Sequence, residues 1–401
     1  MQQRVTFESR QGHSLSGIIH IPDNGRVLAY ALFAHCFTCT KNINAAANIV
    51  DVLSRQGIAT LRFDFTGLGA SKGKFEESSF STNIEDLVDA ANFLSQEYDA
   101  PQLLVGHSLG GTAILAASKY IDSAKAVASI ASPAEPEHIL HLLSEDLECI
   151  ADEGSANVNL AGRTFTFKQE FVDDVKKHTV DFKHLKKALM VMHSPIDDTV
   201  AIAEAAKIFG EAMHPKSFVT LENADHLLSK AADSTYVGTV LATWAKRYIE
   251  LAEHDSSEDP GVTVTAKTDQ GFVCNVNANG HLLVADEPKS VDGGTNLGPT
   301  PYDLLASSLG TCTAMTLNMY ARFKKLPVES VTVEVAHDRI HATDCVDCEQ
   351  SEGHVDVFTR KILISGELDQ AQKERMLEIA DRCPVHKTLE NEIKIETHLK
   401  Q

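Results

Sequence analysis

Short apolar runs alternate with amphipathic stretches over about the first 250 residues. The runs are rich in β-branched and aliphatic residues, as in 27–36, 58–65, 102–108, 124–132, 188–194 and 217–223. Between them, apolar residues recur every three to four positions, as in 44–57, 83–94, 111–120 and 237–250. Continuous apolar strands that alternate with helices are typical of a parallel sheet covered on both faces. This part of the chain is therefore predicted to be an α/β domain, with bounds 1–251.

Two stretches depart from this rhythm. Residues 4–22 read as two alternating strands around turn residues, which predicts an antiparallel hairpin at the edge of the sheet. Residues 134–187 separate two predicted strands by far more than the two to six residues of a usual strand-helix loop. We expect this insertion to be a cap over a site, and the alternative is a helical excursion without function.

The pattern of predicted strands and helices changes after residues 252–261. This stretch is polar and acidic and ends in Pro-Gly, so it is predicted to be a linker. In residues 262–401 the strands group apart from the helices, which predicts an α+β domain. The expected strands are 262–268, 272–280 and 281–288, and the expected helices are 302–326 and 371–383. Two domains also suit a chain of 401 residues, because single cores stop growing at roughly 250 to 300 residues.

Composition narrows the classes of partner. A hydrophobic content of 43% and a charged content of 23% are ordinary for a folded protein. The formal net charge of -20 disfavours nucleic acid and anionic membrane surfaces, which bind clustered cations. The sequence shows neither a secretory signal nor an apolar run long enough to span a bilayer, so we expect a cytoplasmic location. Eight cysteines in a reducing compartment should remain thiols, available for catalytic, redox or metal chemistry.

The stretch Gln102–Ala117 reads as a strand, a Gly-x-Ser-x-Gly turn and a helix. The two glycines suit a serine in a strained turn, where strand and helix must approach closely. Ser108 would then project from the carboxyl edge of the sheet, where open α/β sheets place their sites. The alternative is a turn with only a structural role.

A serine hydroxyl needs a base and an orienting carboxylate to become a nucleophile. Both follow predicted strands: Asp197 and Asp198 follow 188–194, and His226 follows 217–223. A solvated loop histidine is the alternative for His226. For His107 and His193 a structural role is the favoured interpretation.

On these motifs, residues 1 to about 250 resemble the α/β-hydrolase family. The segment His193–Val200 resembles the family's acid motif, which selects Asp197 over Asp198. The segment after the first parallel strand resembles its oxyanion loop, so the resemblance implies an oxyanion hole made by the amides of Phe37 and Leu109. The implied activity is hydrolysis of a small-molecule ester by Ser108, His226 and Asp197, without a cofactor.

The segments around Cys312 and Cys383 resemble the OsmC family of thiol-based proteins. The resemblance implies Cys312 as the attacking thiolate, Cys383 as its disulfide partner, an organic hydroperoxide as substrate, and a homodimer formed through this domain. Peroxide-reducing relatives also use an Arg and a Glu. This chain has Tyr302 at the position of the Glu, and the sequence identifies no counterpart of the Arg. The alternative is that both cysteines are buried small hydrophobes.

The chain also carries two Cys-x-x-Cys pairs. The first, Cys36 and Cys39, lies in the expected oxyanion loop without a thioredoxin-like context, so neither a metal clamp nor a redox pair is predicted. The second lies among two histidines in a polar loop, where tetrahedral zinc and an exposed thiol loop are both open, at His341, Cys345, Cys348 and His354.

Together these features resemble the bifunctional α/β-hydrolase/OsmC proteins, with a serine esterase as the predicted activity. Two alternatives stay open. In one, the thiol domain is the main enzyme, a hydroperoxide reductase. In the other, it serves only as a dimerisation scaffold.

Overall fold

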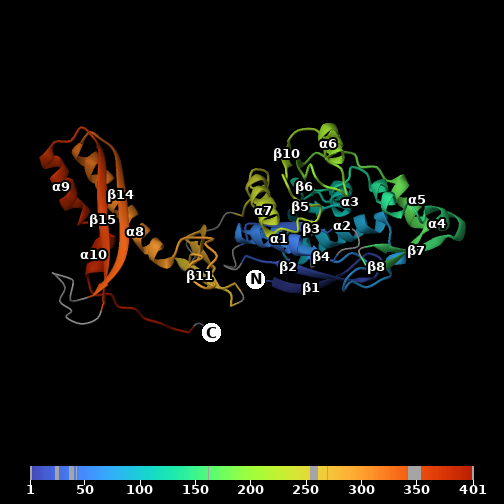
Figure 1. Ribbon diagram of the computed structural model, residues 1–401, viewed down its shortest axis with the longest axis horizontal. Coiled ribbons are helices and arrows are strands. Elements are labelled where there is room, and N and C mark those ends of the chain that lie inside the picture. The colour runs from blue at the N-terminus through green and yellow to red at the C-terminus, as the bar shows by residue number, and fades with distance from the viewer. Residues whose placement is uncertain are drawn as a thin grey trace. The chain divides into compact units, whose positions relative to one another are not determined.

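The computed structural model (Figure 1) describes residues 2–22, 27–35, 40–41, 43–160, 162–252, 261–268, 270–341 and 354–399. The chain forms two compact units. One comprises Met1–Thr263 with Asn277–Leu282, and the other comprises Val264–Val276 with Leu283–Gln401.

The first unit is built on one sheet of eight strands among the residues described, in the order β1-β2-β4-β3-β5-β6-β9-β10. The strands β3 to β10 of this sheet are parallel, whereas β1 and β2 form an antiparallel hairpin at its edge, as predicted. The bounds are β1 Gln2–Glu8, β2 Ser14–His20, β3 Ala29–Ala34, β4 Ile58–Phe63, β5 Pro101–His107, β6 Ala126–Ile130, β9 Ala188–His193 and β10 Lys216–Thr220.

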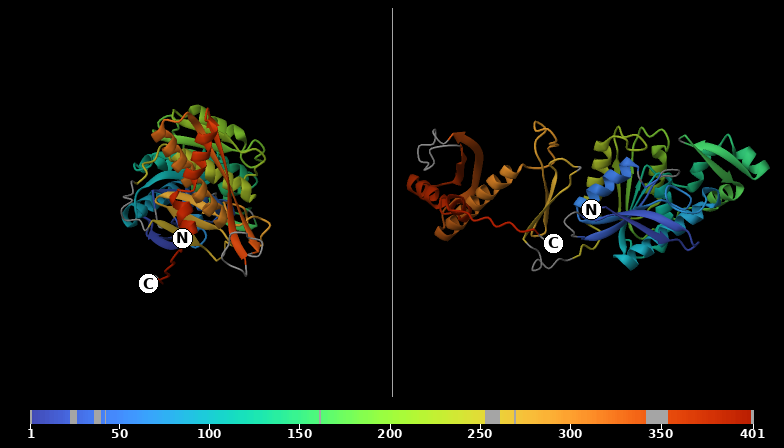
Figure 2. Two further views of the ribbon diagram at one scale, coloured as in Figure 1. Left: turned by 90° about the vertical axis from the view of Figure 1, so that its left-hand side faces the viewer. Right: turned by 90° about the horizontal axis from the view of Figure 1, so that it is seen from below.

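Helices cover both faces of this sheet, which confirms the α/β class (Figures 1 and 2). On one face, α1 (Asn44–Arg55) and α7 (Ala231–Ala245) pack on alternate residues of the strands. On the other face lie α2 (Phe80–Glu97), α3 (Leu109–Ala117) and α6 (Ile202–Glu211). Because both faces are buried, the central strands are apolar at nearly every position.

The insertion 134–187 folds into short elements at one end of the unit (green in Figures 1 and 2). They are the 3-10 helix η3 Pro136–Leu143, α4 Leu147–Glu153, β7 Ser155–Leu160, β8 Arg163–Lys168 and α5 Gln169–Lys177. Phe165 and Phe167 of β8 pack on Phe75, with ring centroids 4.7 and 5.4 Å away. The insertion therefore contributes to the same hydrophobic core as the sheet. The sequence pattern did not predict the β7–β8 hairpin.

Beyond α7 the chain forms a three-stranded sheet of β11 (Val262–Ala266), β12 (Cys274–Ala278) and β13 (His281–Ala285). The helix α8 (Pro301–Lys324) follows, and begins with a capping box between Thr300 and Asp303. Then come β14 Val328–His341, β15 His354–Gly366, α9 Gln370–Ala380 and α10 Pro384–Glu390. Strands and helices are grouped apart, as expected for an α+β arrangement.

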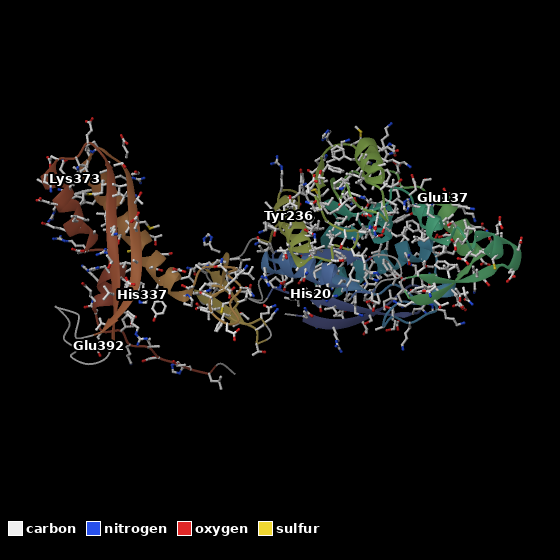
Figure 3. The ribbon with its side chains drawn as sticks, viewed as in Figure 1. His20, Glu137, Tyr236, His337, Lys373 and Glu392 are labelled. Carbon is white, nitrogen blue, oxygen red and sulfur yellow. The ribbon has the colours of Figure 1, made fainter. Side chains whose placement is uncertain are left out.

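The long helix α8 packs on the β14–β15 hairpin and on α9. Tyr302 in its first turn stacks on His337 of β14, which is labelled in Figure 3, with ring centroids 4.2 Å apart. The buried cluster at the other end of α8 is small, and consists of Leu317, Ala321, Met376, Ile379 and Ala380. Within the described ranges, every helix is too short or too polar to cross a bilayer.

A buried carboxyl group, Asp86 on α2, fixes the loop that follows β4. It is fully buried, and its two oxygens accept hydrogen bonds from the backbone N–H of Thr66 at 2.8 Å and from the hydroxyl of Thr66 at 3.1 Å. Burial raises the pKa of Asp86 to about 6, and the hydrogen bonds from Thr66 only partly oppose this. The ionised carboxylate is therefore less favoured in the folded state than in the unfolded chain.

The Asp86→Asn variant should gain stability relative to wild type as the pH rises from acidic to neutral. With a folded pKa of about 6 and an unfolded value of about 3.9, the folded state binds more protons between these values, so wild-type stability falls as pH rises through them. The Asn side chain can keep both contacts with Thr66 and does not ionise. The difference in unfolding free energy, variant minus wild type, should grow by up to about 3 kcal/mol between pH 4 and pH 7.

Urea unfolding followed by fluorescence of the single tryptophan, Trp244 on α7, measures this difference in the first unit. Glu97→Gln, at an exposed position on the same helix, is the matched control and should show no such pH trend. A variant minus wild-type difference that is flat with pH would refute the linkage.

Candidate active site

The turn between β5 and α3 holds Ser108 in an unusual backbone conformation. Its φ is 55° and its ψ is -133°, a strained combination for a residue with a side chain. A Cβ on Gly106 would lie 2.5 Å from the backbone oxygen of Gly110, and a Cβ on Gly110 would overlap the backbone of His35. Only glycine at both positions therefore allows strand and helix to meet around the serine.

Ser108, His226 and Asp197 form a continuous chain of hydrogen bonds. The Oγ of Ser108 lies 3.0 Å from Nε2 of His226, and Nδ1 of His226 lies 2.8 Å from Oδ2 of Asp197. His226 follows β10 and Asp197 follows β9, so all three side chains come from the carboxyl edge of the sheet. Because the Asp197 carboxylate accepts a hydrogen bond from Nδ1–H of His226, Nε2 carries no proton and can accept a hydrogen bond from the serine hydroxyl.

The carboxylate of Asp197 is buried but well provided with donors. Its other oxygen, Oδ1, accepts from the backbone N–H groups of Thr199 at 2.9 Å and Val200 at 2.8 Å. Burial alone would raise the pKa of Asp197, but hydrogen bonds from His226 and from these amides outweigh it, so the pKa lies below its ordinary value. Asp198, the other carboxylate that follows β9, accepts a hydrogen bond from the hydroxyl of Thr199 at 3.2 Å.

Two further buried histidines hold the backbone around this chain of hydrogen bonds. His107 donates through Nε2 to the carbonyl of His226 at 2.7 Å, and His193 donates to the carbonyl of Val200 at 2.8 Å. Burial lowers the pKa of His107 to about 4, so its ring is neutral at physiological pH. Both contacts are of the kind expected for histidines with a structural role.

Leu109, one of the two predicted oxyanion donors, is the first residue of α3, where backbone N–H groups have no partner within the helix. The other donor, Phe37, and the first cysteine pair lie outside the described residues. Lys41, among the described residues, is held by Asp64: its backbone N–H donates at 2.7 Å and its ammonium at 2.5 Å. Both side chains are almost fully buried, so this ion pair fixes Lys41 against the residue that follows β4.

In the second unit, Cys383 lies beside the part of α8 that carries Cys312: the hydroxyl of Thr313, the next residue along the helix, is 3.6 Å from Sγ of Cys383. Cys383 precedes α10 and is fully buried, whereas Cys312 lies on α8 and is partly exposed. Both thiols are free. Burial acts to raise the pKa of Cys383, but hydrogen bonds from the His386 N–H and from the side chains of Thr313 and Cys312, together with the charge of Arg360, outweigh it and lower the pKa.

Sequence reasoning missed Arg360, which lies on β15. Its guanidinium donates to the Thr313 hydroxyl at 3.0 Å, to the carbonyl of Ala380 at 3.1 Å, to Asp381 at 2.9 Å and to Nδ1 of His386 at 2.9 Å. The available signal was an arginine at an inward position of an alternating strand, Val357–Ile364.

The zinc candidate falls largely outside the described residues, because Cys345 and Cys348 lie there. In the backbone, His341 and His354 face each other as the last pair of the β14–β15 ladder. Within the residues described, His, Cys, Asp and Glu side chains form no group of three or more suited to a metal ion.

Known protein families match each part of the chain. Residues 35–151 match the model of the family described as serine aminopeptidase, S33, and residues 293–398 match that of the OsmC-like proteins. The esterase domain of a Rhodothermus marinus protein is 43% identical, with a TM-score of 0.52, and the match covers 62% of this chain and 99% of that domain. Est1E of Butyrivibrio proteoclasticus with bound ferulic acid is 18% identical over 61% of this chain and 98% of Est1E, with a TM-score of 0.52, and so supports the fold alone.

The human mitochondrial palmitoyl-protein thioesterase ABHD10 is 35% identical over 114 residues, which are 28% of this chain and 32% of that protein. The chain thus spans about a third of the length of this curated relative. With the sheet topology and the serine turn, these matches agree with a hydrolase that precedes an OsmC-like region. The chain belongs to the α/β-hydrolase family through its N-terminal part, which is fused to a C-terminal OsmC-like domain.

Proposed function

We propose that the first unit is a carboxylesterase-type serine hydrolase in which Ser108, His226 and Asp197 act as a catalytic triad. The observation that carries this proposal is the unbroken chain of hydrogen bonds at 3.0 and 2.8 Å from the serine hydroxyl to a buried carboxylate. The 43% identity to an esterase domain supports the same reaction class.

In the acylation step, Oγ of Ser108 attacks the ester carbonyl while Nε2 of His226 takes its proton. Asp197 keeps the imidazole in the required tautomer and stabilises the imidazolium that forms. The amides of Leu109 and Phe37 hold the developing oxyanion, and losing such a donor typically costs about 2.7 to 4 kcal/mol of transition-state stabilisation. His226 then returns the proton to the leaving alcohol, and water releases the acyl group by the same steps in reverse order.

A thioester is the second candidate substrate. The observation that favours it is the 35% identity to a palmitoyl-protein thioesterase. That match covers 114 residues. Rates with a matched pair of acyl esters and acyl thioesters of the same chain length decide between the two. Esterase action remains our proposal because the esterase domain matches over nearly its whole length.

Replacing Ser108 by Ala or Asp197 by Asn should each lower kcat on p-nitrophenyl esters on the order of 10⁴-fold or more. The first change removes the nucleophile. The second leaves His226 in the wrong tautomer while the backbone geometry is kept. Initial rates over a series of acyl lengths, with covalent labelling by a fluorophosphonate probe, measure both losses.

The chain offers a matched control for each variant. Ser129→Ala removes a buried serine hydroxyl on the neighbouring strand β6 that makes no hydrogen bond within the described structure. Asp198→Asn changes the adjacent carboxylate. Both controls should keep wild-type rates, and equal rates in wild type and Ser108→Ala would contradict the esterase proposal.

For the second unit we propose a thiol-dependent reduction of organic hydroperoxides by Cys312 and Cys383. Two free thiols support this proposal: Cys312 is partly exposed, and Cys383 is buried among hydrogen-bond donors. Cys312 would attack the terminal peroxide oxygen to give a sulfenic acid and an alcohol, and Cys383 would displace hydroxide to form a disulfide. Turnover then requires an external dithiol reductant.

Consumption of cumene hydroperoxide with a dithiol reductant should be lost in Cys312→Ser and in Cys383→Ser, because neither variant can close the disulfide. Cys149→Ser, which changes a free, exposed cysteine on α4, is the control and should keep full activity. If neither pair variant changes any activity of the protein, the second unit is a scaffold.

We further propose that the OsmC-like unit forms a homodimer through the exposed face of α8. Met315, Met319 and Phe323 lie one turn apart on this helix and are 71%, 68% and 77% exposed. The two-stranded sheet β14–β15 has only a small buried cluster beside it. Such a sheet is only marginally stable in water unless another surface packs on it. A second copy of the same surface supplies that cover with matching apolar chemistry.

Met319→Glu should convert the dimer to monomers of 43.6 kDa, because a charge would be buried in an apolar interface. Sedimentation velocity across a concentration series measures the change. Leu377→Glu on α9, also an exposed apolar position, is the control and should leave the dimer intact. A wild-type protein that sediments as a monomer at all concentrations would refute the proposal.

A further inference from the structure

The buried thiol of Cys383 sits among hydrogen-bond donors. Its Sγ lies 3.3 Å from the backbone N–H of His386 and 3.6 Å from the hydroxyl of Thr313. A sulfur that accepts from several donors is stabilised as a thiolate, because each contact is stronger with the charged form.

Arg360 contacts the side chains of both residues that donate to this sulfur. One guanidinium nitrogen donates to Oγ1 of Thr313 at 3.0 Å, and the other donates to Nδ1 of His386 at 2.9 Å. The Thr313 hydroxyl has a single proton, and it can give that proton to the carbonyl of Leu309 at 2.8 Å or to Cys383. A bond donated by Arg360 occupies an acceptor position of this hydroxyl and fixes its place between the two acceptors, the Leu309 carbonyl and the sulfur.

Two carboxylates lie beside Arg360 and His386, and both are largely exposed. Asp381 accepts from Arg360 at 2.9 Å, but its carboxylate is largely exposed and its charge is screened by water. Glu390 lies 3.0 Å from the far nitrogen of His386, on the side away from Arg360. The guanidinium itself is mostly buried, so its charge acts on Cys383 with little screening.

Cys312 has a different environment. It is partly exposed on α8, whereas Cys383 is fully buried. The pair therefore divides two tasks: the accessible sulfur can meet an electrophile, and the buried sulfur can hold a negative charge.

We propose that Arg360 is the positioning residue that stabilises the thiolate form of Cys383, through its contacts with Thr313 and His386. This inference rests on the proposed thiol function for its chemical use. The Cys383 thiolate takes the proton of Cys312 as Cys312 attacks the peroxide, and passes it to the departing alkoxide, which leaves as the alcohol. The regenerated thiolate then attacks the Cys312 sulfenic acid: the S–S bond forms, the S–O bond breaks, and hydroxide leaves.

The test is a pH titration of thiolate absorbance, near 240 nm, on the reduced full-length protein. The signal present in wild type and lost in Cys383→Ser should have a midpoint below about 8.5, the ordinary value for cysteine. In Arg360→Met the midpoint should rise by about one pH unit or more. Thr313→Val, which preserves side-chain shape, should raise it by a smaller amount.

Arg339→Met, at an exposed position on β14, is the matched control and should leave the midpoint unchanged. A midpoint of Cys383 at or above about 8.5 in wild type, or one that Arg360→Met and Thr313→Val both leave in place, would overturn the proposal. If Arg360→Met does not fold, Thr313→Val and the wild-type titration still decide it. Hydroperoxide consumption by the same wild-type sample separates the two questions: a low midpoint without consumption contradicts the peroxidase function alone, and consumption with an ordinary midpoint contradicts the role of Arg360 alone.

Discussion

The geometry of the first unit depends on one strained residue. Ser108 can keep a left-handed backbone only because β5 and α3 are packed so closely that their glycines admit no side chain. That packing in turn requires strands buried on both faces and helices on each side. The serine hydroxyl is thereby held at the edge where β9 and β10 end, so His226 and Asp197 need only short loops to reach it. The energy stored in the turn is offset by the sheet around it.

Much of this arrangement follows from local sequence. The apolar runs identified the parallel strands, and Gly106, Ser108 and Gly110 identified the turn. Asp197 and His226 were selected because both follow a strand, and parallel strands bring their carboxyl ends to one edge. The choice of Asp197 over Asp198 came from a resemblance, and the backbone amides of Thr199 and Val200 supply its physical basis, since they point to one carboxylate and not to the other.

Other features could not be found in this way. The β7–β8 hairpin has short strands whose pairing is decided by contacts with Phe75, which lies far away in sequence. Arg360 is similar, because its partners come from α8, from the end of α9 and from α10, and none of them is a sequence neighbour. The alternation of the strand Val357–Ile364 places Arg360 on its inward face, but it does not show that the guanidinium organises a buried sulfur. Such residues become visible only when the tertiary contacts are known.

The contribution of the insertion to the main hydrophobic core has a consequence for how this enzyme class can diversify. Phe167, Val172 and Phe182 share that core with the helices beneath the sheet. The segment therefore cannot be removed, or exchanged between homologous hydrolases, as an independently folding unit. Substitutions at its buried residues must be accommodated by the same core as the sheet, whereas substitutions at its exposed residues need not be.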